Sequence, residues 1–425
     1  MTPRLTRAAQ SWLGLVALAL SLALLSGRPE LVLLATPLVL YLVAGFQPAA
    51  PSLYRLAHEV SAERLFEGDR LTVTFTLSAR TRIDSIELVE PLPPTLQLVS
   101  GFNRVASSLH AGQSASWSYE IRCLRRGQFA LGIVHVRLRN RSGLWAADAR
   151  HGNPTPLHVY PYVAPLRCLP LPRRPRTVVG NYIAPVAAAG VEPADIRPFA
   201  PGDEIRHVNW RASLRLRTLH VTTHHPERNA DVVLMLDTLA EVGAPPRTTL
   251  DASVRAAAAL ARAYLARRDR VGMIDYGGAL RWVKPGWGPT QLERLLDALV
   301  AAKPLFTYVR KDLAMVPPRG LPPGALVIAL SPLIDVRFVD AVADLAARRF
   351  DVVVVAVSPI DATRASVPRS VLNDLACRLW ALERRAQIDD LRRRGLAVVE
   401  WSGDEPIQLA LVLLSHRRSR RSAVA

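Results

Sequence analysis

The chain of 425 residues contains little cysteine and little lysine. Its three cysteines are far apart and form no CxxC pair or Cys/His cluster, so neither a zinc site nor a disulfide framework is indicated: Cys123, Cys168 and Cys377. Only three lysines occur, so arginine supplies nearly all of the formal net charge of +18: Lys284, Lys303 and Lys311. No helix-turn-helix or RNA-binding pattern accompanies this charge, and we therefore expect no nucleic-acid partner.

Signatures of catalysis are absent as well. The sequence has no Gly-x-Ser-x-Gly elbow, no Cys/His pair and no constellation of paired carboxylates, so we expect a protein that is not an enzyme. A hydrophobic content of 50% nevertheless provides for packed cores.

Two uncharged apolar runs, Ser11–Gly27 and Leu31–Phe46, open the chain. As helices, runs of this length reach roughly 24 Å, slightly less than the ~30 Å of a hydrocarbon core. We predict a transmembrane helical hairpin over residues 1–50, with a cleaved signal peptide as the alternative. Arg4 and Arg7 precede the first run and basic residues follow the second, so the positive-inside rule places both ends in the cytoplasm.

A small β-sandwich is predicted for residues 51–161. Arg70–Ser78 alternates apolar and hydroxyl residues, as a half-buried strand does, and several shorter candidates follow it between turns. The proline-rich Pro154–Pro175 stretch is typical of an extended connector. We expect the region 162–230 to combine this connector with a polar segment that packs on the next domain.

Residues 231–416 predict a doubly wound α/β domain, and residues 417–425 form a basic tail. Val232–Leu236 is a continuous apolar run, typical of a strand buried on both faces, and helices and strands alternate after it. Ligands bind at the carboxyl ends of such strands, where we expect Asp237, Ser331 and the Gly286–Thr290 loop.

This alternation is similar to the von Willebrand factor A fold. That resemblance implies a metal site built from Asp-x-Ser-x-Ser after the first strand, a later threonine and an aspartate after the fourth strand. Asp237 and Thr290 match it, whereas Leu239, Glu241 and Pro332 replace the two serines and the aspartate. A hard cation such as Mg²⁺ needs oxygen ligands, so the motif is degenerate, and Asp237 has the alternative role of capping its strand.

The most distinctive stretch is Gly190–Arg228, here called the clasp. Its eight notable side chains are Glu192, Arg197, Gly202, Asp203, Arg206, Trp210, Arg211 and Ser213. Together with the Val159-Tyr160-Pro161 triplet, it resembles the bacterial family called domain of unknown function 58, through the motifs Ile196-Arg197-x-Phe199-x-Pro201-Gly202-Asp203 and Arg206-x-Val208-x-Trp210-Arg211-Ala212-Ser213. The resemblance covers nearly the whole chain, with Pro193 and Leu214 as departures.

The clasp has two interpretations. Its arginines can pair two-pronged with carboxylates such as Asp203, and Trp210 can cover an arginine, which gives a network that holds the segment in place. The same groups can instead bind an acidic peptide or a terminal carboxylate of a partner protein.

The family resemblance implies a bacterial inner-membrane protein that works with a MoxR-type AAA+ ATPase on an unknown client in envelope assembly or maturation. We therefore expect a non-enzymatic, membrane-anchored adaptor or scaffold without a cofactor, its soluble domains in the cytoplasm. The alternative is a metal-dependent adhesion-type binding module that uses Mg²⁺ at its degenerate site.

Overall fold

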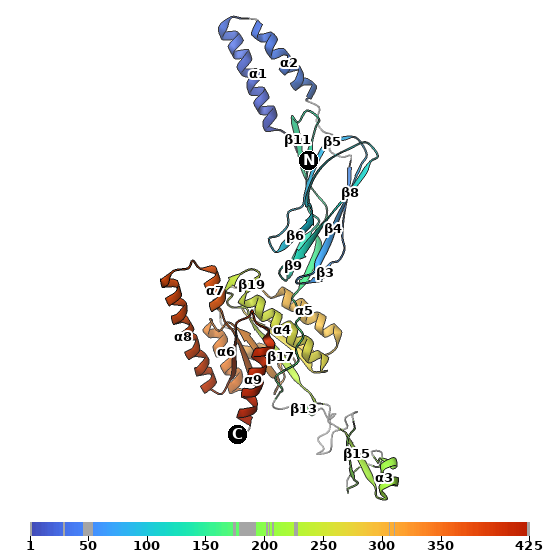
Figure 1. Cartoon of the computed structure of the whole chain (residues 1–425), viewed down its shortest axis with the longest axis vertical. Helices are drawn as coiled ribbons and strands as arrows, with labels where there is room; N and C mark the ends of the chain where they lie inside the picture. The colour runs from blue at the N-terminus through green and yellow to red at the C-terminus, as the bar shows by residue number, and fades with distance from the viewer. Residues whose placement is uncertain are drawn as a thin grey trace. The chain divides into compact units, whose positions relative to one another are not determined.

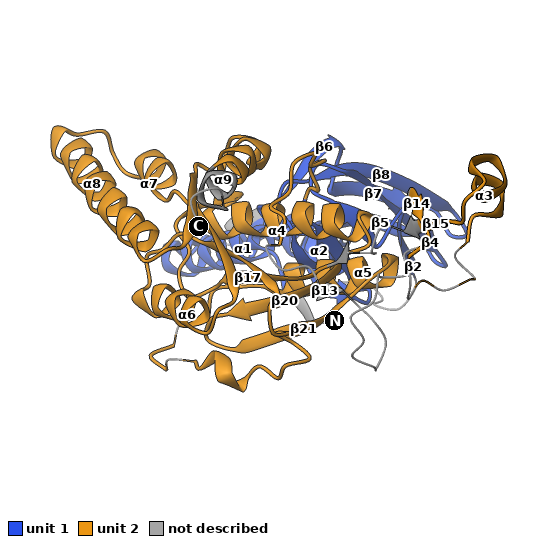
Figure 2. Cartoon of the chain, turned by 90° about the horizontal axis from the view of Figure 1, so that it is seen from below, with its two compact units in different colours: residues 1–161 blue, residues 162–425 orange. Residues whose placement is uncertain are grey.

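The computed structural model describes residues 2–28, 30–45, 54–172, 176–177, 193–200, 203, 205, 208–224, 228–305, 307–309 and 311–422. The chain divides into two compact units, residues 1–161 and 162–425, which Figure 2 colours separately. The prediction of a multidomain chain with an N-terminal apolar helix, β-rich regions and a C-terminal α/β region is confirmed.

Two apolar helices, α1 (Arg7–Ser26) and α2 (Glu30–Gly45), open the first unit (Figure 1). The Thr6 side chain caps α1 by accepting from the Ala9 amide, and Gly27 ends the helix at φ 64°, a conformation natural to glycine. α1 is long and apolar enough to cross a membrane, whereas the apolar helix within α2 is shorter, Ala35–Gly45.

The rest of the first unit is a β-sandwich. One sheet has the order β1-β11-β10-β5-β7, with strands Thr2–Leu5, Trp145–His151, Val134–Arg139, Ile83–Val89 and Arg104–Leu109. A second has the order β2-β4-β8-β6, with strands Tyr54–Val60, Arg70–Ala79, Ser114–Cys123 and Leu96–Gly101. A third joins β3, β12 and β9, with strands Arg64–Phe66, Thr155–Tyr160 and Gly127–Leu131. β12 lies within the stretch for which the prolines predict only a connector.

The core of the sandwich is formed by every second residue of its strands. In β4 every second residue is buried, and Leu71, Val73, Phe75 and Leu77 turn inward between exposed or half-exposed neighbours. One buried polar group lies among these apolar side chains: Glu90 is 1% exposed and accepts hydrogen bonds from the Tyr119 hydroxyl at 2.6 Å and the Gly132 amide at 2.5 Å.

The second unit is centred on a six-stranded sheet with the order β21-β20-β17-β22-β23-β24. Its strands are Leu280–Gly286, Arg270–Tyr276, Asp231–Asp237, Leu326–Ser331, Asp351–Val357 and Ala397–Trp401. β17, β20, β22, β23 and β24 run parallel, and β17 is buried along its whole length, as its continuous apolar run predicts.

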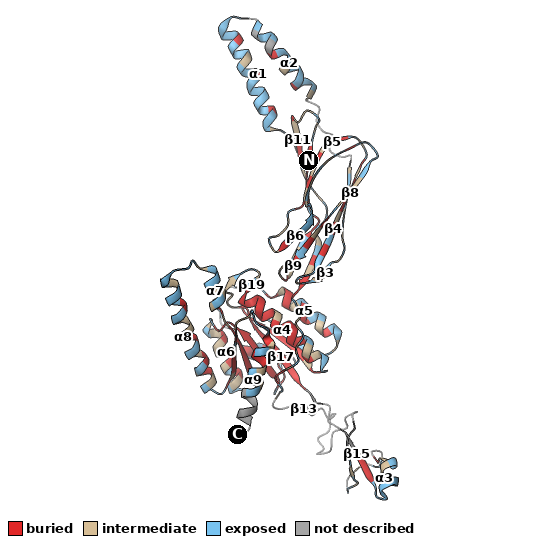
Figure 3. Ribbon diagram, in the orientation of Figure 1, coloured by how far each residue is buried: buried red, intermediate tan, exposed pale blue. Residues whose placement is uncertain are grey.

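Helices cover both faces of this sheet (Figure 1). α6 (Val336–Ala347) and α8 (Val371–Arg393) pack against alternate residues of the strands in one core cluster. The residues that these two helices contribute to the cluster include Phe338, Leu345 and Ile388. α4 (Thr249–Ala266) is the most deeply buried helix in Figure 3 and is followed by α5 (Pro289–Ala301). The remaining elements of this sheet domain are α7 (Ile360–Ser366), α9 (Ile407–Ser422), the 3-10 turn Leu313–Met315 and the short pair β18 (Gly243–Ala244) and β19 (Arg247–Thr248).

The edge strand β21 runs antiparallel to β20, and this overturns one prediction. Leu280 pairs with Tyr276, which also pairs with Asp237, but Gly286 pairs with Val271 at the other end of β20. The Gly286–Thr290 loop therefore lies at the amino ends of the parallel strands, about 16 Å from Asp237 by the rise of the five residue steps from Val271 to Tyr276. The expectation that this loop meets Asp237 and Ser331 was wrong, because it assumed a parallel strand.

Candidate functional site

The strand order places the topological switch point of the sheet between β17 and β22. The chain continues from β17 to β20 on one side and then returns to β22 on the other, so the connections diverge at the carboxyl ends of these two neighbours. Open α/β sheets bind their ligands at such a point. Asp237 ends β17 and Ser331 ends β22, and they face each other at this edge.

Asp237 is fully buried and hydrogen-bonded within the protein. Its Oδ2 accepts from the Ser331 hydroxyl at 2.5 Å, and its Oδ1 accepts from the Leu239 amide at 3.0 Å. Burial away from water raises the pKa of Asp237 to about 7, against the lowering effect of these two hydrogen bonds. The group can therefore carry a proton near neutral pH, and it also caps the end of its own strand.

Arg337 supplies positive charge at the same edge. Its guanidinium binds Asp335 two-pronged, with Nε to Oδ1 at 2.9 Å and Nη2 to Oδ2 at 2.6 Å, and its Nη1 donates to the Thr307 carbonyl at 2.5 Å. The hydrogen bond from Arg337 lowers the pKa of Asp335. On the pKa of Asp237 the two neighbouring charges act in opposite directions, because Asp335 raises it and Arg337 lowers it. Opposed charges at this edge are thus largely compensated by the chain itself.

These residues do not fit a metal site of the expected kind. Asp237 already uses both oxygens, Asp335 is held by Arg337, and Thr290 is exposed at the opposite edge of the sheet. Within the described ranges, no three His, Cys, Asp or Glu side chains are grouped so that they could hold a metal ion. A cation at Asp237 would have to break existing hydrogen bonds.

Sequence reasoning missed Arg384, a buried residue that fixes this edge. Its side chain is 3% exposed and donates to the Pro332 carbonyl, to the Val357 carbonyl at 2.9 Å and to Glu400 Oε1 at 2.9 Å. The helical spacing of the sequence could have identified Arg384 as buried, because it lies seven residues from both Cys377 and Leu391 on the buried stripe of α8. An arginine on an apolar helix face needs acceptors inside the protein.

The clasp contains a small folded element of its own. β14 (Pro193–Pro198) pairs antiparallel with β15 (His220–His224), and α3 (Trp210–Leu216) lies between them in sequence. Asn209 caps α3 by accepting from the Ala212 amide at 3.0 Å. Two further strands, β13 (Arg176–Thr177) and β16 (Arg228–Asn229), pair with each other on either side of it.

The predicted arginine–carboxylate pair is present in the clasp. Arg197 on β14 donates to Asp203 through Nη1 at 2.8 Å and Nη2 at 2.6 Å. Asp203 Oδ2 also accepts from the Ala200 amide at 2.8 Å, which closes the turn. This two-pronged geometry fixes the loop, and it leaves Asp203 with few lone pairs for a partner.

The other predicted clasp residues divide between interior and surface. Ser213 is buried, donates to the Asn209 carbonyl at 2.8 Å and accepts from the His220 amide at 2.9 Å, so it joins α3 to β15. Arg211 is exposed, and Trp210 is 61% exposed with none of the described arginines stacked on its ring. The remaining candidates lie outside the described residues: Glu192, Gly202 and Arg206.

The exposed surface of α3 has an apolar centre with arginines beside it. Leu214 follows Trp210 by one helical turn and is 81% exposed. The neighbouring Arg211, Arg215 and Arg217 are also exposed. An apolar centre with a polar rim is the usual composition of a protein-binding surface.

Comparisons with known proteins agree with the sequence motifs. Residues 195–377 match the family model described as "Protein of unknown function DUF58". The chain is similar to uncharacterized protein YeaD of Bacillus subtilis, with 23% identity over 288 residues, which is 65% of this chain and 70% of that protein. It is also similar to uncharacterized protein Rv1480 of Mycobacterium tuberculosis, with 27% identity over 139 residues, covering 32% of this chain and 44% of that protein.

The solved structures that were matched share little with the chain as a whole. The cupredoxin domain of amoB from Nitrosocaldus yellowstonii has 13% identity and a TM-score of 0.20, over 26% of this chain and 88% of its own. The non-cellulosomal cohesin from Archaeoglobus fulgidus has 11% identity and a TM-score of 0.18, over 25% of this chain and 91% of its own. Overlaps of this size carry no functional argument.

Proposed function

We propose that this protein is a membrane-anchored, non-enzymatic adaptor whose clasp binds a MoxR-type AAA+ ATPase in the assembly or maturation of envelope proteins. The observation that carries the proposal is the surface of α3, where Trp210 and Leu214 are exposed although the described polar groups of Asp203 and Ser213 are hydrogen-bonded within the clasp. Large apolar side chains that a folded element exposes to solvent favour a binding role. The choice of ATPase rests on the resemblance to the DUF58 family.

Membrane anchoring through both helices is supported by strand pairing. β1 precedes α1 and pairs with β11, while β2 and all later strands of the sandwich follow α2. The chain therefore leaves the sandwich through α1 and returns to it after α2. If α1 crosses a bilayer, α2 must cross back, and its 16 residues reach roughly 24 Å, which slight bilayer thinning accommodates.

The membrane end of the sandwich holds the two helices together. Thr6, before α1, donates its hydroxyl to the Gly143 carbonyl at 2.7 Å, and Asn140 donates to the Gly45 carbonyl at the end of α2 at 2.7 Å. The two helices also meet through the rings of Trp12 and Tyr41, 6.0 Å apart. We place this hairpin in a bacterial inner membrane with both soluble units in the cytoplasm, following the positive-inside rule.

A von Willebrand factor A-like fold is part of the same proposal. The strand order β21-β20-β17-β22-β23-β24, numbered within the domain, is 3-2-1-4-5-6, the order of a doubly wound sheet. Such a domain would serve here as a scaffold that presents the clasp. The internally paired carboxylates at its edge favour a role that does not depend on a metal.

The test is binding of the full-length protein in micelles to a purified MoxR-type ATPase. The double variant Trp210→Ala/Leu214→Ala should weaken binding about 30-fold, about 2 kcal/mol, because exposed aromatic anchors dominate interface energies. The matched control Leu372→Ala/Leu379→Ala removes two exposed leucines from α8 and should bind normally. Thermal unfolding should be unchanged in both. Equal binding by the clasp variant and the control, or no ATPase binding by the native protein, would refute the proposal.

A further inference from the structure

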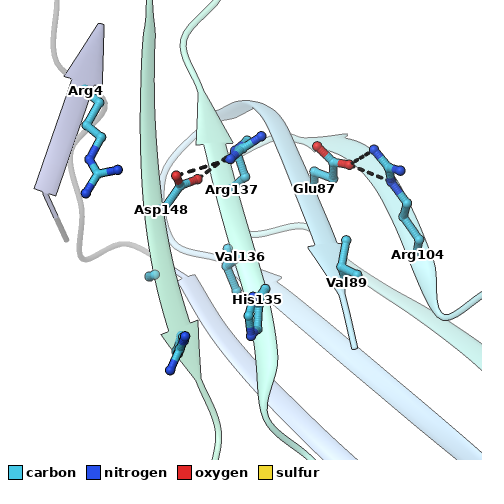
Figure 4. A pocket seen from close by; sticks show the side chains of 10 residues that line it. Arg4, Glu87, Val89, Arg104, His135, Val136, Arg137 and Asp148 are labelled. Carbon is cyan, nitrogen blue, oxygen red and sulfur yellow. Dashed lines mark hydrogen bonds and ion pairs between the residues drawn. The ribbon is translucent and has the colours of Figure 1, made fainter. Parts of the chain in front are cut away.

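The outer face of the β1-β11-β10-β5-β7 sheet carries a groove of about 560 Å³ (Figure 4). Four arginines line it, together with two carboxylates: Arg4, Arg104, Arg137 and Arg150 with Glu87 and Asp148. They come from five strands but share one face, because the pairings Arg137–Asp148, Arg137–Glu87 and His135–Arg150 place them opposite one another on the outer side of the pleat.

Two of the arginines are neutralised by the two carboxylates. Arg137 binds Asp148 through Nε at 2.7 Å and Nη2 at 3.2 Å, and Arg104 donates its Nε to Glu87 Oε1 at 2.7 Å, as the dashed lines in Figure 4 mark. Arg4 also acts electrostatically on Asp148, so four arginines share two carboxylates and the lining keeps a net positive charge. The groove is thus built to hold an anion, with paired arginines that fix its walls.

Its place in the chain indicates where the anion comes from. β1, which carries Arg4, continues directly into α1, and Arg4 lies three residues before Arg7, the first residue of the helix. Three extended residues span at most about 10 Å. The 20 residues of α1 reach about 30 Å, the thickness of a hydrocarbon core, so the first turn of α1 lies at the membrane interface. Arg4 is then at the level of the lipid headgroups.

We propose that this groove binds the phosphate of an anionic phospholipid headgroup beside α1. Arginine suits the task, because its planar guanidinium donates two parallel hydrogen bonds to phosphate oxygens. Basic residues next to a membrane-spanning helix are attracted to anionic lipid in the cytoplasmic leaflet. The proposal rests on the membrane hairpin and is independent of any adaptor role, since lipid binding needs no partner protein.

The test uses the full-length protein in zwitterionic micelles, titrated with dihexanoyl phosphatidylglycerol and monitored by calorimetry. The variant Arg4→Gln/Arg150→Gln should bind this lipid at least about 5-fold more weakly, from roughly 1 kcal/mol for Arg4 near the headgroup. Arg150 should add less, because it lies four residues beyond Ala146, the partner of Arg4, on the side away from α1. Arg64→Gln/Arg70→Gln is the matched control, with the same loss of charge on β3 and β4 outside the groove. The control should bind as the native protein does.

Further variants and competing ligands in the same titration distinguish a phospholipid site from a site for another anion. Arg4→Lys/Arg150→Lys keeps the charge but not the planar fork, and it should bind with an affinity between those of the glutamine variant and the native protein. Unchanged thermal unfolding of each variant shows that the groove variants fold. Dihexanoyl phosphatidylcholine should not compete. Equal affinity of the glutamine variant and the control would overturn the proposal. Competition by millimolar inorganic phosphate, or by an acidic peptide, at the strength of the lipid would also overturn it, in favour of a soluble ligand or a protein partner.

Discussion

A pH series on the Asp237→Asn variant tests the charge arrangement at the sheet edge. Burial raises the pKa of the Asp237 carboxyl from its ordinary 3.8 to about 7 in the folded chain. Below pH 4 the carboxyl is protonated in both folded and unfolded states. Between pH 4 and pH 7 only the unfolded chain releases the proton, so the folded state loses stability as the pH rises, and the loss is complete above pH 7.

The magnitude follows from the size of the shift. A difference of about 3 pKa units corresponds to about 4 kcal/mol, at about 1.4 kcal/mol per unit. Asparagine stays neutral and keeps the shape of the protonated carboxyl, with an oxygen that can accept from the Leu239 amide. The stability of the variant relative to the native protein should therefore rise by about 4 kcal/mol between pH 4 and pH 8.

Hydrogen exchange of the β17 and β22 amides, in the full-length protein in micelles and corrected for intrinsic rates, measures this difference without assuming that the two units unfold together. Asp344→Asn, an exposed carboxylate on α6, is the control and should show no such window. A difference between Asp237→Asn and native protein that is constant across pH would refute the reasoning. Added Mg²⁺ should not stabilise the native protein at pH 8; selective stabilisation would instead support the metal-dependent alternative.

Four further substitutions test the interior. Tyr119→Phe removes the hydroxyl that donates to buried Glu90 and should lower the free energy of unfolding of the sandwich by about 2 kcal/mol, measured by exchange of its strand amides. The buried bonds to Glu90 outweigh its burial and lower its pKa, so this unit should lose stability as the pH falls below the usual glutamate range, more weakly in Glu90→Gln. Arg384→Met should cost about 3 kcal/mol, measured in the same way on β22 and β23, because it leaves buried carbonyls without donors. Gly277→Ala should lower the melting temperature, since its Cβ would lie 2.0 Å from Thr238 Oγ1.

Local sequence patterns predicted the elements better than their pairing. A strand that is buried on both faces is apolar throughout, and the run Val232–Leu236 identified β17 in this way. A strand that is buried on one face alternates apolar and polar residues, and Arg70–Ser78 identified β4. β12 was missed because the prolines around it suggested a connector, yet Pro156 lies in a strand that pairs with β9 and β3. Strand direction leaves no such pattern in the sequence, so Thr290 was assigned to the wrong edge of the sheet.

The sequence identified several residues of the candidate site but did not show how their charges are paired. Pairing of a clasp arginine with a carboxylate such as Asp203 was predicted from their chemistry, and the structure shows it at Arg197, whereas Ser213 is a structural link that its sequence context did not reveal. Arg337 was not singled out, because its neighbours at the edge come from β17 and from the loop before the 3-10 turn, far away in sequence. Contacts between distant segments depend on the fold as a whole, which a local pattern does not encode.

The two polar regions differ in what the binding of a partner would cost. At the sheet edge, Asp237 is sealed from solvent and Asp335 is held by Arg337, so an incoming ligand would have to replace bonds that are already made. In the described part of the clasp Asp203 and Ser213 are also hydrogen-bonded, but Trp210 and Leu214 remain exposed to water. Burying these side chains against a partner removes apolar surface from water without breaking an internal hydrogen bond. Binding of a partner through the clasp would therefore break fewer internal hydrogen bonds, which is why our proposal places the partner there.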